Sequence, residues 1–403
     1  MLKALPGFRE MALEILDSLV ALRHDLHAHP ELAFQEHRTA GRILERLGAV
    51  PNLKVRGGVG GTGVVAVLND GRDGPCLALR ADMDALPIQE AVDRPYASTV
   101  SGVMHACGHD GHVACLVGAA MLLSKCAADV PGRVKFIFQP AEEDGGGASR
   151  MIEQGALDNP KVDAIWGLHG WTELPLGFVG VAPGPVMAGT RSFDMTFRGK
   201  GGHAAYPHKG SDVIVAASRF VTDLQALRTR RVDPVEPAVV SICQVQAGRT
   251  YNVLPEVCHV KGTIRALNTA TLDSLWDQVQ YLAQTIATSL DAEASSELAD
   301  AYPPVVNHAG CTALVEAVGR SLLGDSQVVR TPPTMGGEDF AYYGQRIPAA
   351  FYRLGLRPTG CVSIPPIHNP CYDFNDDAIP YGVAMHCGLA VRFLDDPPAI
   401  LCG

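Results

Sequence analysis

The chain has 403 residues, of which 47% are hydrophobic and 19% charged, and its net charge is −10. A chain of this length exceeds what one hydrophobic core usually supports, so we expect about two domains. The negative charge, without any run of Lys or Arg, argues against nucleic acid or an anionic membrane as the partner and favours a small molecule.

Three features of the sequence indicate the cellular compartment of the protein. The N-terminal sequence MLKALPGFREMALEILDSL carries scattered charges and has no uninterrupted apolar region before a small-residue cleavage site, so no export signal is predicted. The longest apolar run, residues 113–123, is shorter than the roughly 20 residues of a membrane span. The eleven cysteines are scattered without a CxxC pair, which favours free thiols in a reducing compartment. We therefore expect a cytoplasmic protein.

The first half of the chain alternates between helical and strand patterns. Apolar spacing predicts helices at residues 8–26 and 39–47, separated near His29 and Pro30 because proline restricts the residue before it. The next strands are expected at residues 64–68, 76–80, 134–139 and 164–168, with helices at residues 112–125 and 148–154. This alternation predicts an α/β fold with a mainly parallel central sheet flanked by helices.

The middle of the chain has a different order of elements. From residue 187 onward the patterns run strand, helix, strand, strand, helix, strand, which is the order of a ferredoxin-like α+β domain. The stretches PGPV and YPPVV flank this region and suit crossings between domains.

The α/β pattern resumes after this region. A helix is expected from Thr312, a strand at residues 349–354 and a helix at residues 376–393. We therefore expect one α/β domain formed by residues 1–186 plus 304–403. Residues 187–303 form the inserted domain.

Four segments place metal-competent side chains at or just after the ends of expected strands. They are HACGHD at residues 105–110, QPAEE at 139–143, GLH at 167–169 and IHNP at 367–370. Any one of them alone is better explained by a buried structural histidine or an inert cysteine. Together they lie where an open α/β sheet builds its site, beyond the carboxyl ends of the strands.

Metal-assisted hydrolysis is the chemistry that needs such a set. Two divalent ions about 3.5–4 Å apart can bridge a water, lower its pKa and polarise the carbonyl that it attacks. The five protein ligands would be Cys107, His109, Glu143, His169 and His368. Glu142 is left beside Glu143 as a general base, unless the pair is only a solvated acidic turn. The donors suit Zn²⁺, with Mn²⁺, Co²⁺ or Ni²⁺ as alternatives.

Two aspartates follow the apolar strand in LALRADMDALPI. Asp84 could hold a metal-bound histidine in its productive orientation. A turn or cap aspartate is an equally good interpretation from spacing alone. His105 and His112 flank the expected ligands and are interpreted as structural.

Longer motifs carry a resemblance to a known family. They include LRHDLHAHPELAFQE, ALRADMDALPI, MHACGHDGH, FQPAEEDGGGA, GLHG, RGKGGHAAYPHKGSD, NVLPE, MGGEDF and IHNPCYDFND. In this order they resemble the metal-dependent amidohydrolases that include hippurate hydrolase, N-acyl-L-amino acid amidohydrolase and indole-3-acetyl-amino acid hydrolase, relatives of aminoacylase and glutamate carboxypeptidase. The resemblance covers nearly the whole chain.

The resemblance implies a zinc-peptidase-like catalytic domain and an inserted domain that serves for dimerisation and as a lid. It implies two divalent metal ions per subunit, the five ligands given above and Glu142 as the general base. Asp84 matches an aspartate that supports a ligand. Asp82 falls where more distant relatives place a ligand histidine, which a site shifted toward Cys107 and His109 would account for.

The resemblance also implies functional residues in and after the inserted domain. His203 of GGHAA resembles a histidine that reaches the neighbouring subunit's site and helps to hold the oxyanion, so a homodimer or higher homo-oligomer is expected. Asn252 and Arg265 fall where relatives bind the substrate's carboxylate, which a guanidinium can grip bidentately. Gly336 and Gly337 match backbone that lies against substrate. By spacing alone, His203 could pack in a loop and Arg265 could be a surface residue.

The expected function is hydrolysis of the amide bond of an N-acyl amino acid or a related small conjugate. Glu142 would activate a metal-bridging water and then protonate the leaving nitrogen. A dipeptidase or carboxypeptidase, or an N-acetyl-diaminopimelate deacetylase, is the alternative within the same superfamily. A binding protein that has lost catalysis is the alternative of another class, although all five ligands and the base are present.

Overall fold

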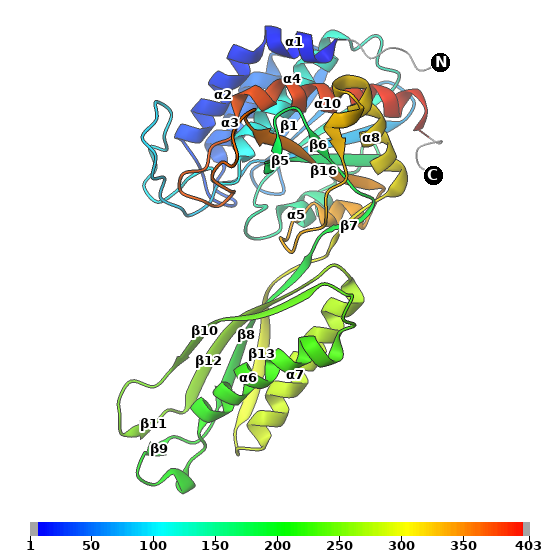
Figure 1. Cartoon of the computed structure of the whole chain (residues 1–403). Coiled ribbons are helices and arrows are strands. Elements are labelled where there is room, and N and C mark those ends of the chain that lie inside the picture. Colours follow the sequence, from blue (N-terminus) through cyan, green and yellow to red (C-terminus); the bar gives the residue numbers. More distant parts are fainter. Residues whose placement is uncertain (1–6, 398–403) are drawn as a thin grey trace. The chain divides into compact units, whose positions relative to one another are not determined.

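The computed structural model describes residues 7–397, which divide into two compact units (Figure 1). The larger unit contains the chain up to Gly184, Val306–Pro332 and the chain from Asp339 onward. The smaller unit contains Pro185–Val305 and a second short piece, Pro333–Glu338. The chain leaves the larger unit in β7 (Gly184–Met187) and returns in β14 (Val305–Asn307).

The larger unit is built on an eight-stranded sheet with the order β1-β2-β4-β3-β5-β16-β6-β15. The strands are β1 (Leu53–Val59), β2 (Gly63–Leu68), β3 (Cys76–Asp82), β4 (Arg133–Gln139), β5 (Ala164–Pro175), β6 (Val179–Gly180), β15 (Val328–Val329) and β16 (Ala349–Arg357). The central strands β4, β3, β5 and β16 are parallel, whereas β1 and β2 form an antiparallel edge. The expected mainly parallel α/β sheet is therefore present, and antiparallel strands at its β1 and β2 edge make the whole sheet mixed.

Helices flank this sheet. They are α1 (Phe8–Glu14), α2 (Leu16–Ala28), α3 (His37–Gly48), α4 (His109–Lys125), α5 (Gly147–Glu153), α8 (Ala309–Leu323), α9 (Ala341–Gly344) and α10 (Ile379–Asp395). The single helix expected at residues 8–26 is divided at Ile15, where φ is −111° and ψ is 7°. Apolar periodicity continues across this break and so does not reveal it.

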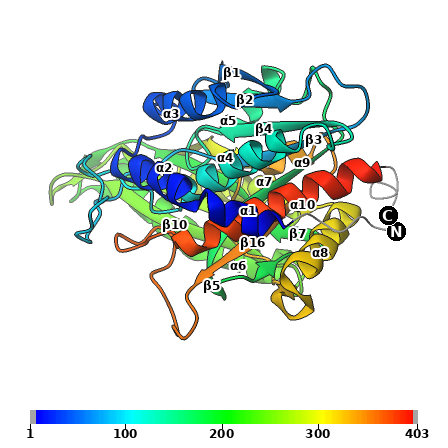
Figure 2. The ribbon, with the colours of Figure 1, turned by 90° about the horizontal axis from the view of Figure 1, so that it is seen from above.

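Helix α4 lies at the centre of the larger unit and is buried along almost its whole length. It packs against α2 and α10, and Figure 2 shows α1 running beside α10. A Cβ atom on Gly118 would lie 2.6 Å from Val383 and 2.7 Å from Leu19, so only glycine permits this close packing. The tight packing fixes the start of α4, which carries His109.

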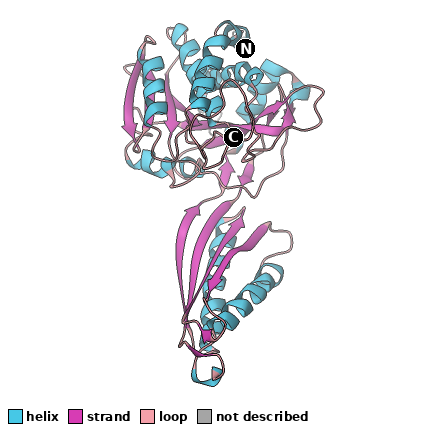
Figure 3. Ribbon diagram, turned by 90° about the vertical axis from the view of Figure 1, so that its left-hand side faces the viewer, coloured by secondary structure: helices cyan, strands magenta, loops and turns pink. Residues whose placement is uncertain are grey.

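The smaller unit is an antiparallel four-stranded sheet with two helices on one face (Figure 3). Its elements are β8 (Gly189–Arg198), α6 (Val213–Arg231), β10 (Ala238–Ala247), β12 (Val257–Ala266), α7 (Thr269–Thr288) and β13 (Glu293–Tyr302), with the short pair β9 (Gly202–His203) and β11 (Val253–Leu254). Asp212 caps α6 and Asn268 caps α7 through side-chain oxygens, which satisfies the first backbone N–H groups. The element order is ferredoxin-like, as expected.

Among residues 7–397, no helix combines the length and the apolar character that crossing a bilayer requires. The longest helix, α7, alternates apolar with polar residues because one of its faces packs on the sheet of the smaller unit.

Candidate metal centre

The parallel strands of the larger unit deliver polar side chains to one edge of the sheet. Strand β3 ends at Asp82, and the turn after β4 carries Glu142 and Glu143. His169 lies within β5, next to β3 in the sheet, and His109 is the first residue of α4. The carboxyl ends of neighbouring parallel strands meet in this way at a common site.

The structure brings the five expected ligands together. The donor atoms of Cys107, His109 and His169 lie within 4.8 Å of one another, and so do those of Cys107, Glu143 and His368. The Cys107 Sγ atom is 3.3 Å from His169 Nε2, and His368 Nε2 is 3.2 Å from Glu143 Oε1. The two groups share Cys107, so two ions held by them would be neighbours.

Two donor atoms in this cluster indicate that a cation fits there. His109 Nε2 and Glu143 Oε1 are buried, lie 3.9 Å apart and make no hydrogen bond, although His368 Nε2 lies 3.2 Å from Glu143 Oε1. Burying such atoms without a hydrogen bond costs free energy. Thiolate, imidazole and carboxylate donors are those that Zn²⁺ and related divalent ions accept in proteins. The residues therefore fit a divalent metal.

The electrostatics of the cluster also favour a cation. Burial raises the pKa of the Cys107 thiol well above its usual value, and the nearby Glu143 and Glu142 carboxylates raise it further. Burial alone would lower the pKa of His109, but Asp82 and Asp84 outweigh it and raise the pKa to about 10. The carboxylates thus create a strongly negative potential, which a divalent ion would neutralise.

Asp84 supports two of the expected ligands at once. Its Oδ1 atom is 3.3 Å from His109 Nδ1, and its Oδ2 atom accepts a hydrogen bond from the backbone N–H of Glu143 at 3.0 Å. Because Asp84 is almost completely buried, these contacts are shielded from water. The carboxylate is therefore well placed to orient the His109 ring.

The structure shows the surroundings of the two histidines, His105 and His112, and of Asp82, whose roles the sequence left open. His112 Nδ1 lies 2.6 Å from Asp82 Oδ1, and its Nε2 accepts a hydrogen bond from the Gly170 N–H. Asp82 also pairs with Arg80 at 2.6 Å. His105 is buried without a hydrogen bond to either ring nitrogen, and burial lowers its pKa to about 4, so the ring is neutral.

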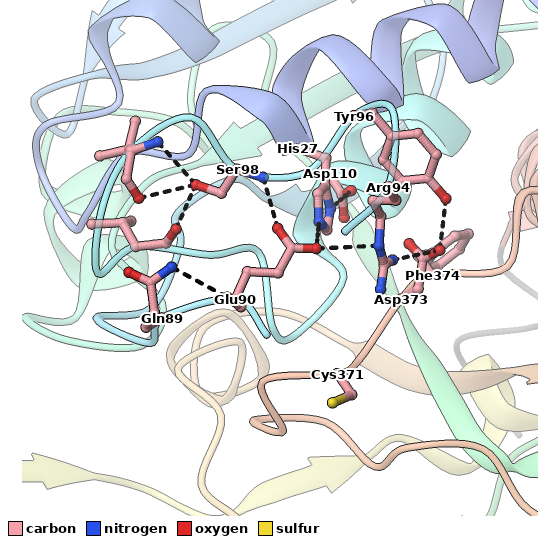
Figure 4. A network of polar contacts seen from close by, with 12 residues as sticks. His27, Gln89, Glu90, Arg94, Tyr96, Ser98, Asp110, Cys371, Asp373 and Phe374 are labelled. Atoms are coloured by element: carbon pink, nitrogen blue, oxygen red, sulfur yellow. Dashed lines mark hydrogen bonds and ion pairs between the residues drawn. The ribbon is translucent and has the colours of Figure 1, made fainter. Parts of the chain in front are cut away.

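A buried polar network, which the sequence analysis did not predict, holds the segment that follows His368. The Arg23 guanidinium donates to the Phe374 carbonyl at 2.6 Å and to the Asp373 carboxylate at 2.7 Å. The Asp373 carboxylate also accepts a hydrogen bond from the Tyr96 hydroxyl at 2.7 Å (Figure 4). Arg23 and Asp373 lie in the motifs LRHDLHAHPELAFQE and IHNPCYDFND, but neither motif indicates that the two side chains pair.

A second part of the network reaches the start of α4. Figure 4 shows the Glu90 carboxylate between His27 and Arg94, and Arg94 between Glu90 and Asp373. His27 Nδ1 lies 2.8 Å from the carboxylate of Asp110, the residue after His109. The network therefore links the segment after His368 to the segment that presents His109.

The remaining expected residues belong to the smaller unit. His203 and Asn252 are exposed, and the Ala204 N–H donates to the Asn252 carbonyl. Arg265 is half-buried and its Nη1 atom donates to the Met335 carbonyl at 2.9 Å. Gly336 and Gly337 lie in the piece Pro333–Glu338, where the Gly336 carbonyl accepts from the Ala188 N–H.

An α/β sheet with an inserted ferredoxin-like unit and a histidine, cysteine and glutamate cluster at its carboxyl edge defines a class of metal-binding hydrolases. Sequence comparison gives the family: the model of Peptidase family M20/M25/M40 matches residues 78–392. The chain belongs to this family, and the expectation of an enzyme is confirmed.

Individual relatives cover nearly the whole chain. An IAA-amino acid hydrolase ILR1-like 2 from Arabidopsis thaliana is 40% identical over 95% of this chain and 87% of its own length. An N-acetylcysteine deacetylase from Bacillus subtilis is 39% identical over 94% of this chain and 97% of its own length. The crystal structure of a Bacillus subtilis protein described as a dinuclear metal-binding peptidase matches with a TM-score of 0.82 and 35% sequence identity. The match covers 95% of this chain and 99% of that one. The expected fold class and family resemblance are confirmed.

Proposed function

We propose that this enzyme hydrolyses the amide bond of N-acyl amino acids or related small conjugates, with two divalent metal ions per subunit. The observation that carries the proposal is the convergence of five metal donors beside Glu142. The names of the similar proteins support an amino acid conjugate as the substrate class.

The donors proposed for the metals are the side chains of Cys107, His109, Glu143, His169 and His368. Ions bound there would lower the pKa of a water and polarise the substrate carbonyl. Asp84 keeps the His109 ring and the Glu143 backbone in place through the contacts described above.

Glu142 is proposed as the general base. Its carboxylate lies within 4.8 Å of donor atoms of His109 and Glu143, so it reaches the same space. It would take a proton from the attacking water at its carboxylate oxygen and return it to the leaving nitrogen. Its burial excludes bulk water that would compete for this proton.

The smaller unit is proposed to contribute to catalysis and substrate binding. Exposed His203 would enter the site of a partner subunit and donate to the oxyanion, which makes a homodimer or higher oligomer necessary. Arg265 and Asn252 would bind the substrate's carboxylate, and the backbone of Gly336 and Gly337 would lie against the substrate.

Glu142→Gln tests the base. We expect the variant to retain two metal ions per chain by elemental analysis and to lose on the order of 100-fold or more in kcat, because the amide cannot accept the proton. Glu153→Gln, on the exposed face of α5, should match the unmodified enzyme. Undiminished kcat in Glu142→Gln would remove the base assignment.

A substrate panel tests the reaction class. An N-acyl-glycine, other N-acetyl amino acids, a dipeptide and N-acetyl-diaminopimelate should be compared after reconstitution with single metals. Preferred cleavage of the acyl amino acids is expected. Cleavage of the dipeptide alone would instead favour the dipeptidase alternative.

Oligomeric state tests the role of His203. Sedimentation should show a dimer or larger species, and His203→Gln should lower kcat without changing the sedimentation coefficient. A monomer with full activity would contradict a site shared between subunits.

A further inference from the structure

Glu36 is a completely buried carboxylate that contacts the turn carrying the proposed base. It immediately precedes α3, and many residues separate it in the sequence from the proposed metal donors. Its Oε1 atom accepts a hydrogen bond from the backbone N–H of Ala141 at 2.9 Å. Its Oε2 atom accepts one from the Thr62 hydroxyl at 2.5 Å. Ala141 immediately precedes Glu142.

Ala141 has an unfavourable backbone conformation that requires support. Its φ is +52°, in the left-handed region that residues with a Cβ atom seldom adopt. Such a conformation persists only where surrounding contacts impose it. The Glu36 carboxylate holds the N–H of Ala141, and the Gly147 N–H holds its carbonyl oxygen at 3.0 Å. The peptide groups on both sides of Ala141 are thereby fixed.

The conformation of Ala141 determines where the next side chain points. The backbone N–H of Glu143 is held separately by Asp84 at 3.0 Å. Glu142 therefore lies between two anchored positions, one set by Glu36 and the other by Asp84. A wholly buried carboxylate is a costly choice if only the fold had to be stabilised, because an apolar side chain could fill the same space.

We propose that Glu36 is a positioning residue for the general base: it holds Ala141 in the left-handed conformation and thereby aims the Glu142 carboxylate. The inference rests on the proposed function, since it assumes that Glu142 is the base. Glu36 should therefore affect kcat and not substrate binding.

Glu36→Ala removes the acceptor and tests the proposal. We expect faster hydrogen exchange in the peptide that covers residues 140–144, in the metal-free protein as well as in the loaded enzyme. We also expect kcat to fall on the order of 10- to 100-fold with little change in KM, because a displaced base lowers the rate of the chemical step. Glu36→Gln keeps an acceptor oxygen for Ala141 and should restore both properties.

Glu31 offers a matched control. Its carboxylate lies near the same helix start and accepts from the Arg38 N–H and the Thr39 N–H of α3, whereas the Glu36 side chain bonds the turn at Ala141 instead. Glu31→Ala should lower the melting temperature and leave kcat and the exchange of residues 140–144 unchanged. Equal loss of kcat in both alanine variants would reduce Glu36 to a structural residue.

Two results would overturn the proposal, and the first needs no variant. One is rapid exchange of the Ala141 amide in the unmodified protein, which would mean that the hydrogen bond to Glu36 is not maintained. The other is native kcat in folded Glu36→Ala. Failure of the base assignment is separate, because it would appear as native kcat in Glu142→Gln while the exchange results stayed as expected.

Discussion

The Nδ1 atom of His27 lies 2.8 Å from Oδ2 of Asp110, and both side chains are buried. Burial alone would lower the pKa of His27, but hydrogen bonds to Asp110 and Glu90 outweigh it and raise the pKa from 6.5 to about 9. Such a histidine stabilises the fold in its protonated form. Its contribution is complete below the unfolded-state pKa and is lost as the pH rises through the folded-state pKa.

We therefore expect the free energy of unfolding to fall between about pH 6.5 and about pH 9, by at most roughly 3 kcal/mol from this group. Urea unfolding across this range measures it. His27→Gln should flatten the decline, whereas His37→Gln, at an exposed position, should leave it unchanged. Identical slopes in the two variants would contradict the expectation.

Arg23 is the cation of the buried network and should be essential to stability. Its guanidinium is fully buried and lies 3.4 Å from Asp110 and 2.7 Å from Asp373. Arg23→Met would leave Asp110 buried with fewer partners, so we expect a loss of about 3–5 kcal/mol in the free energy of unfolding. Arg42→Met removes a partly exposed ion pair with Asp25 and should cost less than about 1 kcal/mol. Chemical denaturation compares the two, and equal losses would argue against a stabilising network.

Substituting alanine for glycine should lower stability at one position, Gly147, and raise it at another, Gly41. A Cβ atom at Gly147 would lie 1.7 Å from the Pro140 carbonyl oxygen, so Gly147→Ala must displace the turn that carries Glu142. We expect a loss of about 1–3 kcal/mol in stability together with a lower kcat. A Cβ atom at Gly41, within α3, would have no other atom within 4 Å. Gly41→Ala should therefore increase the free energy of unfolding by about 0.5–1 kcal/mol. Thermal unfolding and kcat should be measured for both; a stable, fully active Gly147→Ala would show that the turn can shift.

Metal removal should destabilise the larger unit. Asp84, Glu142 and Glu143 gather at the site, and an ion that binds only the folded state stabilises it by mass action. Saturating Zn²⁺ or Mn²⁺ should raise the melting temperature above that in a chelator, with about 3 kcal/mol gained at 100 times the Kd. Cys107→Ala should reduce this shift, and Cys243→Ala, at an exposed position, should not. The same shift in both variants would exclude Cys107 as a ligand.

The α/β class, the inserted unit and the donor set could be expected from sequence because each rests on a local pattern. Strand and helix periods lie within short windows. Glu143 and His169 follow the ends of two predicted strands, and His109 lies shortly before the predicted helix at residues 112–125. His368 was expected from the segment IHNP, although this segment has no helix or strand around it in the structure. The antiparallel pair β1 and β2 and the division of the first helix at Ile15 were not expected. Hydrophobic periodicity indicates neither the direction of a strand nor a helix break of one residue.

The sequence alone determined which residues are chemically able to form a metal site, because donor type and spacing are properties of the chain. Only the tertiary structure decided which charged groups support them. The Arg23 and Asp373 side chains meet across 350 positions, and Glu36 reaches Ala141 across 105. Partnerships of this kind depend on how packed elements bring distant backbone segments together, and no local pattern records that.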